Sequence, residues 1–255
     1  MRQETVGFSA EKVKRYAFPS KNYFENYFPL LFMKPETPEK VITSEIISRA
    51  EAFVKQELGK DSSGHDWWHI YRVTNTARQL AQLENADLFI CELAALLHDI
   101  ADEKLNNSKT AGLQKVENWL IQNKVPASET ERVMEIISTM SYNGGHNKPM
   151  QTLEGKIVQD ADRIDALGAL GIARTFAYAG HKGHLMHNPE LAVRTEMTKE
   201  EYRNTESTAI NHFYEKLLKL KDLMNTEAGK QMAAERHAFM EDFLAQFYRE
   251  WEASK

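Results

Sequence analysis

The chain has 255 residues, of which 42% are hydrophobic and 27% charged, with a formal net charge of −5 at pH 7. These fractions are typical of a globular protein that is long enough to bury a large core within one domain. The negative net charge argues against a general nucleic-acid binder, because such domains tend to be basic. It still allows a small phosphorylated ligand, which needs only a local group of cations.

The one cysteine, Cys91, excludes a disulfide within the chain and fits a reducing compartment. We expect it to pack as a small apolar residue. The apolar stretch 27–33 is too short to cross a bilayer. It contains Pro29, and no small-residue cleavage site follows it, which argues against a signal peptide. The sequence therefore favours a cytoplasmic protein that does not enter a membrane.

Residues 1–40 differ from the rest of the chain. They contain a basic cluster at residues 12–15 and an aromatic stretch at residues 23–32, and they lack a sustained helical period. We interpret residues 1–40 as an accessory arm and residues 41–255 as a single functional domain. A chain that starts at Met33 is expected to keep the fold of this domain.

Apolar residues recur at helical spacing along the domain, and no stretch alternates convincingly as a strand does, so the predicted fold class is all-α. Ser44 and Ser128 are the expected N-caps of two of the helices. The predicted helices cover residues 44–58, 65–83, 87–100, 111–123, 128–140, 151–179, 200–225 and 228–253.

The predicted helix 65–83 places a histidine among apolar residues. His69 shares one stripe with Val73, Ala77 and Leu80, so its side chain is expected to face inward. A buried histidine of this kind is more often a hydrogen-bonded core residue than a metal ligand, so His69 alone does not indicate a metal site.

The next predicted helix ends with His98 and Asp99, directly after an apolar run. An aspartate is almost never buried unless it is paired or binds a metal. One divalent cation would satisfy both side chains, because neutral imidazole and carboxylate are ordinary metal ligands. This pair therefore indicates a candidate metal site.

Three aspartates, Asp160, Asp162 and Asp165, interrupt the apolar pattern of the predicted helix 151–179. Each needs a partner, which is either a cation at a functional site or a structural contact with Arg163, Arg174 or a helix end. The structural alternative is favoured for Asp160 and Asp165.

Two polar loops are predicted between the later helices. Residues 141–149 contain two glycines and lie where substrate loops commonly occur. The other loop carries His181, His184 and His187. Because no helix is expected there to aim the imidazole rings, we interpret it as a solvated or substrate-covering loop and not as a second metal site.

His69, His98-Asp99 and an aspartate of QDADRIDALG follow the order H…HD…D. From residue 44 to the C-terminal helices, this pattern resembles the HD-domain superfamily of metal-dependent phosphohydrolases. The resemblance is closest to small bacterial HD proteins with the motifs GHDWWH-x-x-RV, at residues 64–73, and DADR-x-DA-x-G, at residues 160–168. It implies an HD-domain helical bundle with a metal in its centre.

The resemblance also implies the ligands, which are His69, His98, Asp99 and Asp162. His65 is the alternative to the first ligand, and Asp160 is the alternative to the last. Two imidazoles and two carboxylates suit one divalent ion such as Mn, Mg, Fe, Ni, Co or Zn, with positions left open for water and phosphate oxygens. Such an ion lowers the pKa of a bound water and polarises a phosphoryl group.

A two-metal site or a cyclic-dinucleotide substrate is not favoured. Between the HD pair and the last aspartate the sequence contains only one further histidine, His146, whereas two-metal members need several. The glycine-tyrosine-proline signature of cyclic-dinucleotide phosphodiesterases is also absent.

Asp102 is the predicted catalytic residue. It lies one turn after Asp99, where some nucleotidase members place an acid that hydrogen-bonds the attacking water. The alternative is a solvated acid at a helix end. The candidate phosphate-binding residues are Lys104, Lys148, Arg163 and Arg174.

The expected partner is a small phosphorylated molecule, with a nucleotide as the leading choice and a deoxynucleoside triphosphate that loses pyrophosphate as the specific one. No stable nucleic-acid partner is expected. The alternatives are a phosphomonoesterase or phosphodiesterase of another small substrate, and a metal-dependent regulatory module without catalysis.

Overall fold

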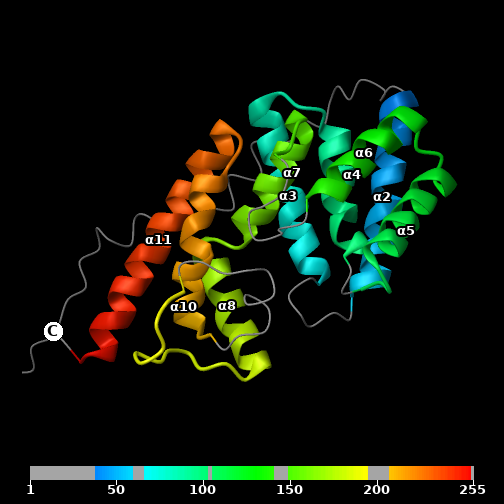
Figure 1. Cartoon of the computed structure of the whole chain (residues 1–255). Coiled ribbons are helices and arrows are strands. Elements are labelled where there is room, and N and C mark those ends of the chain that lie inside the picture. The colour runs from blue at the N-terminus through cyan, green and yellow to red at the C-terminus, as the bar shows by residue number, and fades with distance from the viewer. Residues whose placement is uncertain (1–37, 60–65, 103–104, 141–148, 195–206, 254–255) are drawn as a thin grey trace, which may run out of the picture. The chain divides into compact units, whose positions relative to one another are not determined.

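The computed structural model describes residues 38–59, 66–102, 105–140, 149–194 and 207–253 (Figure 1). Every regular element among these residues is a helix, which confirms the predicted all-α class. The chain divides into two compact units, Met1–Ile42 and Thr43–Lys255. No helix in the described ranges is long and apolar enough to span a membrane.

The described helices follow one another along the chain. The α-helices are α2 (Pro38–Leu58), α3 (Trp67–Glu84), α4 (Leu88–Leu97), α5 (Lys109–Gln122), α6 (Ala127–Thr139), α7 (Leu153–Asp165), α8 (Gly168–Lys182), α10 (Ala209–Glu215) and α11 (Glu227–Trp251). Two 3-10 helices, η2 (His98–Ala101) and η3 (Leu217–Leu223), follow α4 and α10.

Helix α4 lies in the core and contacts α3, α6 and α7. Its sequence LFICELAALL is apolar in almost every direction, so it can be buried on several sides. Asp87 caps its start by accepting a hydrogen bond from the Ile90 amide at 3.2 Å. Cys91 is fully buried in this helix, which confirms its predicted role as a small core residue. The chain then tightens into η2, which begins at His98.

Helices α3 and α7 pack against each other near the middle of Figure 1. The Asp66 carboxylate caps α3 by accepting a hydrogen bond from the His69 amide at 2.8 Å. From this start, the helical period buries His69, Val73, Ala77 and Leu80 on one side, as the sequence predicts. The cap and the apolar stripe together direct His69 into the interior.

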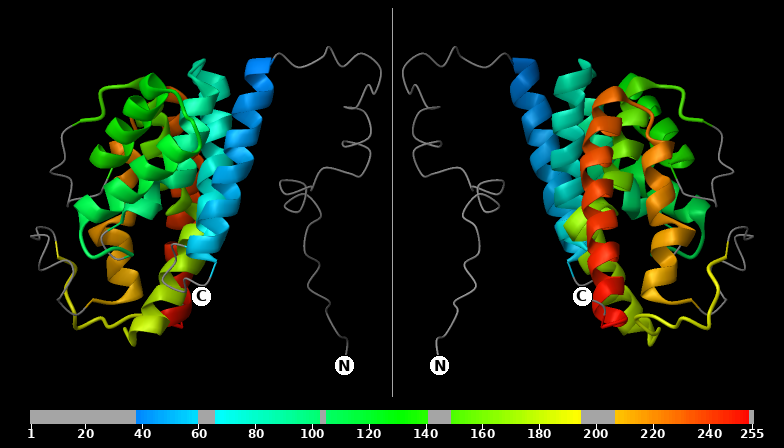
Figure 2. Two further views of the ribbon diagram at one scale, coloured as in Figure 1. Left: turned by 90° about the vertical axis from the view of Figure 1, so that its right-hand side faces the viewer. Right: turned by 90° about the vertical axis from the view of Figure 1, so that its left-hand side faces the viewer.

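The long C-terminal helix α11 contacts α7, α8 and η3, and the right-hand view of Figure 2 shows it in front, beside the orange segment of α10 and η3. Its start is attached to α7 by Asp160. This buried carboxylate accepts hydrogen bonds from the amides of Asn225, at 2.9 Å, and Thr226, at 2.8 Å, and from the Thr226 hydroxyl at 2.8 Å. Asp160 thus pairs with a helix end, as the structural alternative predicts.

Two predicted N-caps are wrong. Helix α2 begins at Pro38, so Ser44 lies within it and does not cap its start. Proline is well tolerated in the first turn of a helix because the amide hydrogen it lacks has no partner there. Helix α6 begins at Ala127 after Pro126, and the Ser128 hydroxyl donates to Glu129.

Two predicted helices are each broken. The predicted helix 151–179 consists of α7 and α8, which meet at Leu167 and Gly168. Gly168 has φ = +70°, a backbone angle that residues other than glycine rarely adopt. Of the predicted helix 200–225, the described part holds α10 and η3, separated at Lys216. Helix α8 also extends further than predicted, so His181 lies in its last turn instead of in a loop.

Candidate metal centre

Three side chains from α3 and η2 converge in the interior. His69, His98 and Asp99 each offer one ligand atom, and these atoms all lie within 4.8 Å of one another. One Asp99 oxygen is 3.5 Å from Nε2 of His69, and the other is 3.3 Å from Nε2 of His98. His69 and His98, which the sequence places on different helices, therefore face the same carboxylate.

His98 has a defined orientation. Its Nδ1 lies 2.8 Å from the carbonyl oxygen of Ala95, which can only accept a hydrogen bond, so Nδ1 carries the proton. In the neutral ring, Nε2 is then the nitrogen that carries the lone pair. This atom is buried and has no hydrogen-bond partner among the described residues. A buried nitrogen with a directed lone pair is well suited to a metal ion.

Asp162 approaches the same point from α7. Its Oδ1 is 3.4 Å from Nε2 of His69 and 4.0 Å from Nε2 of His98. Neighbouring ligands of an ion with bonds of about 2.1 Å lie roughly 3 Å apart, so these separations fit a common ion after small adjustments. The Asp162 side chain is 40% exposed, which marks the open side of the cluster. Asp160 of α7, in contrast, is fully buried against the residues that begin α11.

Asp165 contacts the other nitrogen of His69. Its Oδ2 is 2.8 Å from Nδ1 of His69. Arg72 donates to both oxygens of Asp165, from Nε at 2.7 Å and from Nη2 at 3.0 Å. Arg174 of α8 also donates to Oδ2. Burial would raise the pKa of Asp165, but the hydrogen bonds from His69 and Arg72 outweigh it and hold this pKa well below its ordinary value.

The carboxylates also change the acidity of His69 in the metal-free protein. Burial would lower its pKa, but the hydrogen bonds to Asp162 and Asp165 and the charge of Asp99 outweigh burial and raise the pKa to about 9. Partial burial would likewise raise the pKa of Asp162, yet the hydrogen bond with His69 outweighs it and lowers this pKa to about 2. The cluster therefore favours a positive charge at its centre, which either a proton or a cation can supply.

The chain is similar to proteins of one family. The profile of the HD domain matches residues 67–167, from the start of α3 to just beyond α7. Bacillus subtilis YpgQ is 41% identical over 200 residues, which make up 78% of this chain and 90% of YpgQ. The chain belongs to the HD-domain family.

Solved structures of HD proteins support the same assignment. An HD-superfamily hydrolase from Bacillus thuringiensis is 50% identical, with a TM-score of 0.68, and the match covers 83% of this chain and 100% of that one. The structure of Bacillus subtilis YpgQ in complex with ADP is 37% identical, with a TM-score of 0.67 and coverages of 82% and 96%. The family assigns this HD protein to the metal-dependent phosphohydrolases in general.

The other predicted site residues of this HD protein lie in different places. Asp102 is half-buried and follows η2 in an extended conformation. Arg174 is bound to Asp165, and Arg163 donates to the Leu223 carbonyl, toward the segment that precedes α11. Three predicted candidates, His65, Lys104 and Lys148, lie outside the described residues, and so does His146.

The three later histidines are not part of the cluster formed by His69, His98 and Asp99. His187 packs its ring against α11, with 4.8 Å between its centroid and that of Trp251. His181 and His184 are exposed. The interpretation of these histidines as a solvated or substrate-covering segment stays a prediction.

Asp165 is the residue whose role sequence reasoning missed in part. Its pairing with an arginine is expected from the sequence and is confirmed for Arg174. Its contact with His69 is not expected. The spacing of Asp162 and Asp165 could have indicated this contact, because residues three apart share one face of α7.

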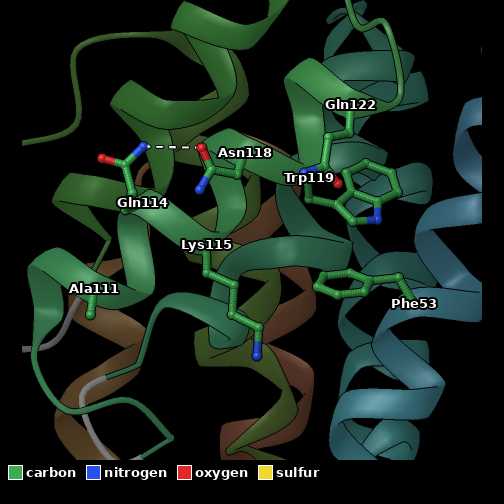
Figure 3. A pocket seen from close by; sticks show the side chains of 7 residues that line it. All are labelled: Phe53, Ala111, Gln114, Lys115, Asn118, Trp119 and Gln122. Carbon is green, nitrogen blue, oxygen red and sulfur yellow. Dashed lines mark hydrogen bonds between the residues drawn. The ribbon is translucent and has the colours of Figure 1, made fainter.

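A surface groove elsewhere in the molecule is not part of this centre. It lies between α2 and α5, where the rings of Phe53 and Trp119 stack with 5.6 Å between their centroids (Figure 3). Lys115 also lines it and pairs with Glu57 at 2.5 Å. The residues that line this groove include no histidine or carboxylate, so it lacks the groups for metal-assisted hydrolysis.

Proposed function

We propose that this HD protein hydrolyses a phosphate or pyrophosphate bond of a nucleotide, with one divalent ion held by His69, His98, Asp99 and Asp162. The observation that carries the proposal is the convergence of two buried imidazoles and the Asp99 carboxylate, with the Asp162 carboxylate 3.4 Å from Nε2 of His69. Their two negative charges offset a divalent ion. An ion bound there supplies an acidified water and polarises a phosphoryl oxygen.

The open side of the cluster supports the approach of a substrate beside Asp162. This side chain is 40% exposed, whereas those of His69 and His98 are 2% and 6% exposed. The histidines are thus held by the core, and the exposed carboxylate marks the face that a phosphate group can reach. Ligands held by packed helices keep their geometry during the reaction, which favours catalysis over loose binding.

Asp102 is the proposed proton acceptor. Its amide donates to the Asp99 carbonyl at 3.0 Å, and its own carbonyl accepts from the Asn106 side chain at 2.8 Å. The same Asn106 nitrogen donates to the Ile100 carbonyl at 2.8 Å. These bonds fix the backbone of Asp102 relative to the metal ligand Asp99, as a residue that handles a proton at the reacting water requires.

A nucleotide is favoured as the substrate because of the relative YpgQ. That protein has been solved in complex with ADP, and the match spans nearly its full length. A deoxynucleoside triphosphate that releases pyrophosphate is the specific form of the proposal. The proposed contacts to its phosphates come from Lys104, Lys148, Arg163 and Arg174, of which Arg174 is linked to the centre through Asp165.

The test is a panel of ribo- and deoxynucleoside mono-, di- and triphosphates, each with added Mn²⁺ or Mg²⁺. We expect metal-dependent hydrolysis of triphosphates, and the release of pyrophosphate instead of phosphate identifies the bond that is cleaved. Hydrolysis of simple phosphate monoesters but of no nucleotide would favour the phosphomonoesterase alternative. No hydrolysis of any compound by metal-loaded protein would favour the regulatory module.

A further inference from the structure

We propose that Asp165 is a positioning residue that orients His69, so that Nε2 and not Nδ1 of this imidazole binds the metal. The inference rests on the proposed metal site and deepens it, because it assigns a role to a residue outside the four ligands. Arg72 and Arg174 take part by holding the Asp165 carboxylate in place.

The geometry is that of one imidazole held between two carboxylates of the same helix. Asp162 faces Nε2 of His69 at 3.4 Å, and Asp165 faces Nδ1 at 2.8 Å. The two aspartates are three residues apart on α7, which is the spacing that places side chains next to each other on one helical face. Helix α3 therefore places the ring in the interior, and the two carboxylates of α7 constrain its rotation.

Burial separates the roles of the two carboxylates. The Asp165 side chain is 2% exposed and accepts bonds from His69, Arg72 and Arg174 on its two oxygens. These donors occupy the oxygens that a metal would need. Asp162 lies on the open side of the cluster, so it can serve as a ligand. The same helix thus presents one carboxylate to the metal and the other to the histidine that binds it.

Arg72 and Arg174 ensure that Asp165 accepts the hydrogen bond from His69. Each guanidinium is charged at all relevant pH values and can only donate hydrogen bonds, so Asp165 stays an ionised acceptor. An ionised acceptor at Nδ1 of His69 keeps a proton on that nitrogen, so when the ring gives up one proton to a metal ion it is Nε2 that offers the lone pair. Arg72 is three residues after His69 on α3, so ligand and arginine approach Asp165 from the same helical face.

The substitution Asp165→Asn tests this role because it changes chemistry with little change in volume. An asparagine offers one acceptor oxygen and one donor group to a position that receives hydrogen bonds from three side chains. No orientation of the amide satisfies all of them. We expect the affinity for Mn²⁺ or Zn²⁺, measured by competition with a chromogenic chelator, to fall about 10–100-fold.

Glu215→Gln is the matched control. Glu215 is also a buried carboxylate in an ion pair with an arginine, since Arg194 donates to it at 2.8 and 2.7 Å, but it lies on α10. This variant loses a comparable buried pair without altering the contacts of His69. We expect lowered stability with the metal affinity of the unmodified protein. Equal metal affinity in the two variants would overturn the proposal.

A second measurement needs no substitution at Asp165 and is free of any folding defect. In ¹⁵N-labelled protein loaded with diamagnetic Zn²⁺, long-range ¹H–¹⁵N spectra distinguish the two nitrogens of His69, which is assigned by its absence in His69→Gln. We expect a slowly exchanging proton on Nδ1 and coordination through Nε2. Coordination through Nδ1, or a proton on Nε2, would contradict the proposal.

The outcomes also separate this inference from the proposed function. Zn²⁺-loaded protein that shows the expected His69 spectrum but hydrolyses no nucleotide would refute the substrate and leave the role of Asp165 intact. Protein that binds no divalent ion would refute both.

Discussion

Asp160, Asp162 and Asp165 belong to one helix yet have three different environments. Asp160 is bound to the start of α11, Asp162 is half-exposed beside two histidines, and Asp165 is enclosed by His69 and two arginines. As aspartates, all three could either bind a cation or pair with a structural hydrogen-bond donor. The neighbours that the fold supplies decide which carboxylate can bind a cation.

A comparison of two conservative variants separates metal binding from proton transfer. Asp99→Asn should lower both metal occupancy and activity, because Asp99 faces both histidines. Asp102→Asn should keep the metal but lower turnover by roughly 10²-fold or more, because it removes the proposed base without removing a proposed ligand. Bound metal and nucleotide hydrolysis are measured on the same samples. Near-normal turnover of Asp102→Asn would show that the proton is handled elsewhere.

The pKa of His69 predicts how the stability of the metal-free protein depends on pH. This pKa is about 9 in the folded protein and 6.5 in the unfolded chain. Because it is raised on folding, its contribution to stability is fully present below pH 6.5 and is lost as the pH rises through about 9. Urea unfolding in EDTA between pH 6 and 9.5 should show this loss, and His69→Gln should lack it. An identical pH dependence in both proteins would refute the assignment.

The same shift predicts proton release on metal binding. An ion and a proton compete for His69, so the apparent metal affinity should increase with pH until about pH 9. Calorimetric titrations with Mn²⁺ in buffers of different ionisation enthalpy measure the number of protons released. A heat that is independent of the buffer at pH 7.5 would mean that His69 is already unprotonated.

At the scale of the helix, the sequence predicts that a helix exists better than it predicts the residues at which the helix begins and ends. Helices α3 and α11 follow apolar stripes, α4 is apolar on almost every side, and all three are found where expected. The break between α7 and α8 was missed because the apolar period continues across Leu167, and only Gly168, with its positive φ, marks the turn. The early start of α2 was missed because Pro38 can begin a helix as well as end one.

The sequence predicts some contacts of the candidate site and not others. The order of His69, His98 and Asp99 in the sequence was enough to expect them in one place, and the structure brings them together. The contact between His69 and Asp165 depends on how α3 packs on α7, which no local pattern encodes. The roles of Asp102 and of the phosphate-binding cations stay predictions.

The link between α7 and α11 can be tested through Asp160. Asp160→Ala removes the acceptor of the amides of Asn225 and Thr226 and of the Thr226 hydroxyl. Because these bonds involve a buried ionised group, we expect the free energy of unfolding to fall by about 2–4 kcal/mol in urea titrations. Asp222→Ala is the control, since Asp222 is exposed, and it should change stability by less than about 0.5 kcal/mol. Equal effects would show that Asp160 does not hold α11.

At the scale of the whole chain, the N-terminal residues are the part whose role is open to a direct test. A protein that starts at Met33 retains the compact unit Thr43–Lys255. We expect it to keep the helical circular-dichroism signal and the Mn²⁺ affinity of the full chain. Insoluble or weakly helical protein would show that the residues before Met33 complete the core.

The position of α7 also has a consequence for the way the protein opens. This helix holds His69 through Asp162 and Asp165, and it holds the start of α11 through Asp160, so it cannot separate without releasing both. Amide protons of α3, α7 and the first turn of α11 should therefore exchange with solvent at one common rate, as one cooperative unit. An ion bound at His69 would slow exchange even at Gly229, which belongs to no proposed ligand set, and would thereby hold the C-terminal helix in place from a distance.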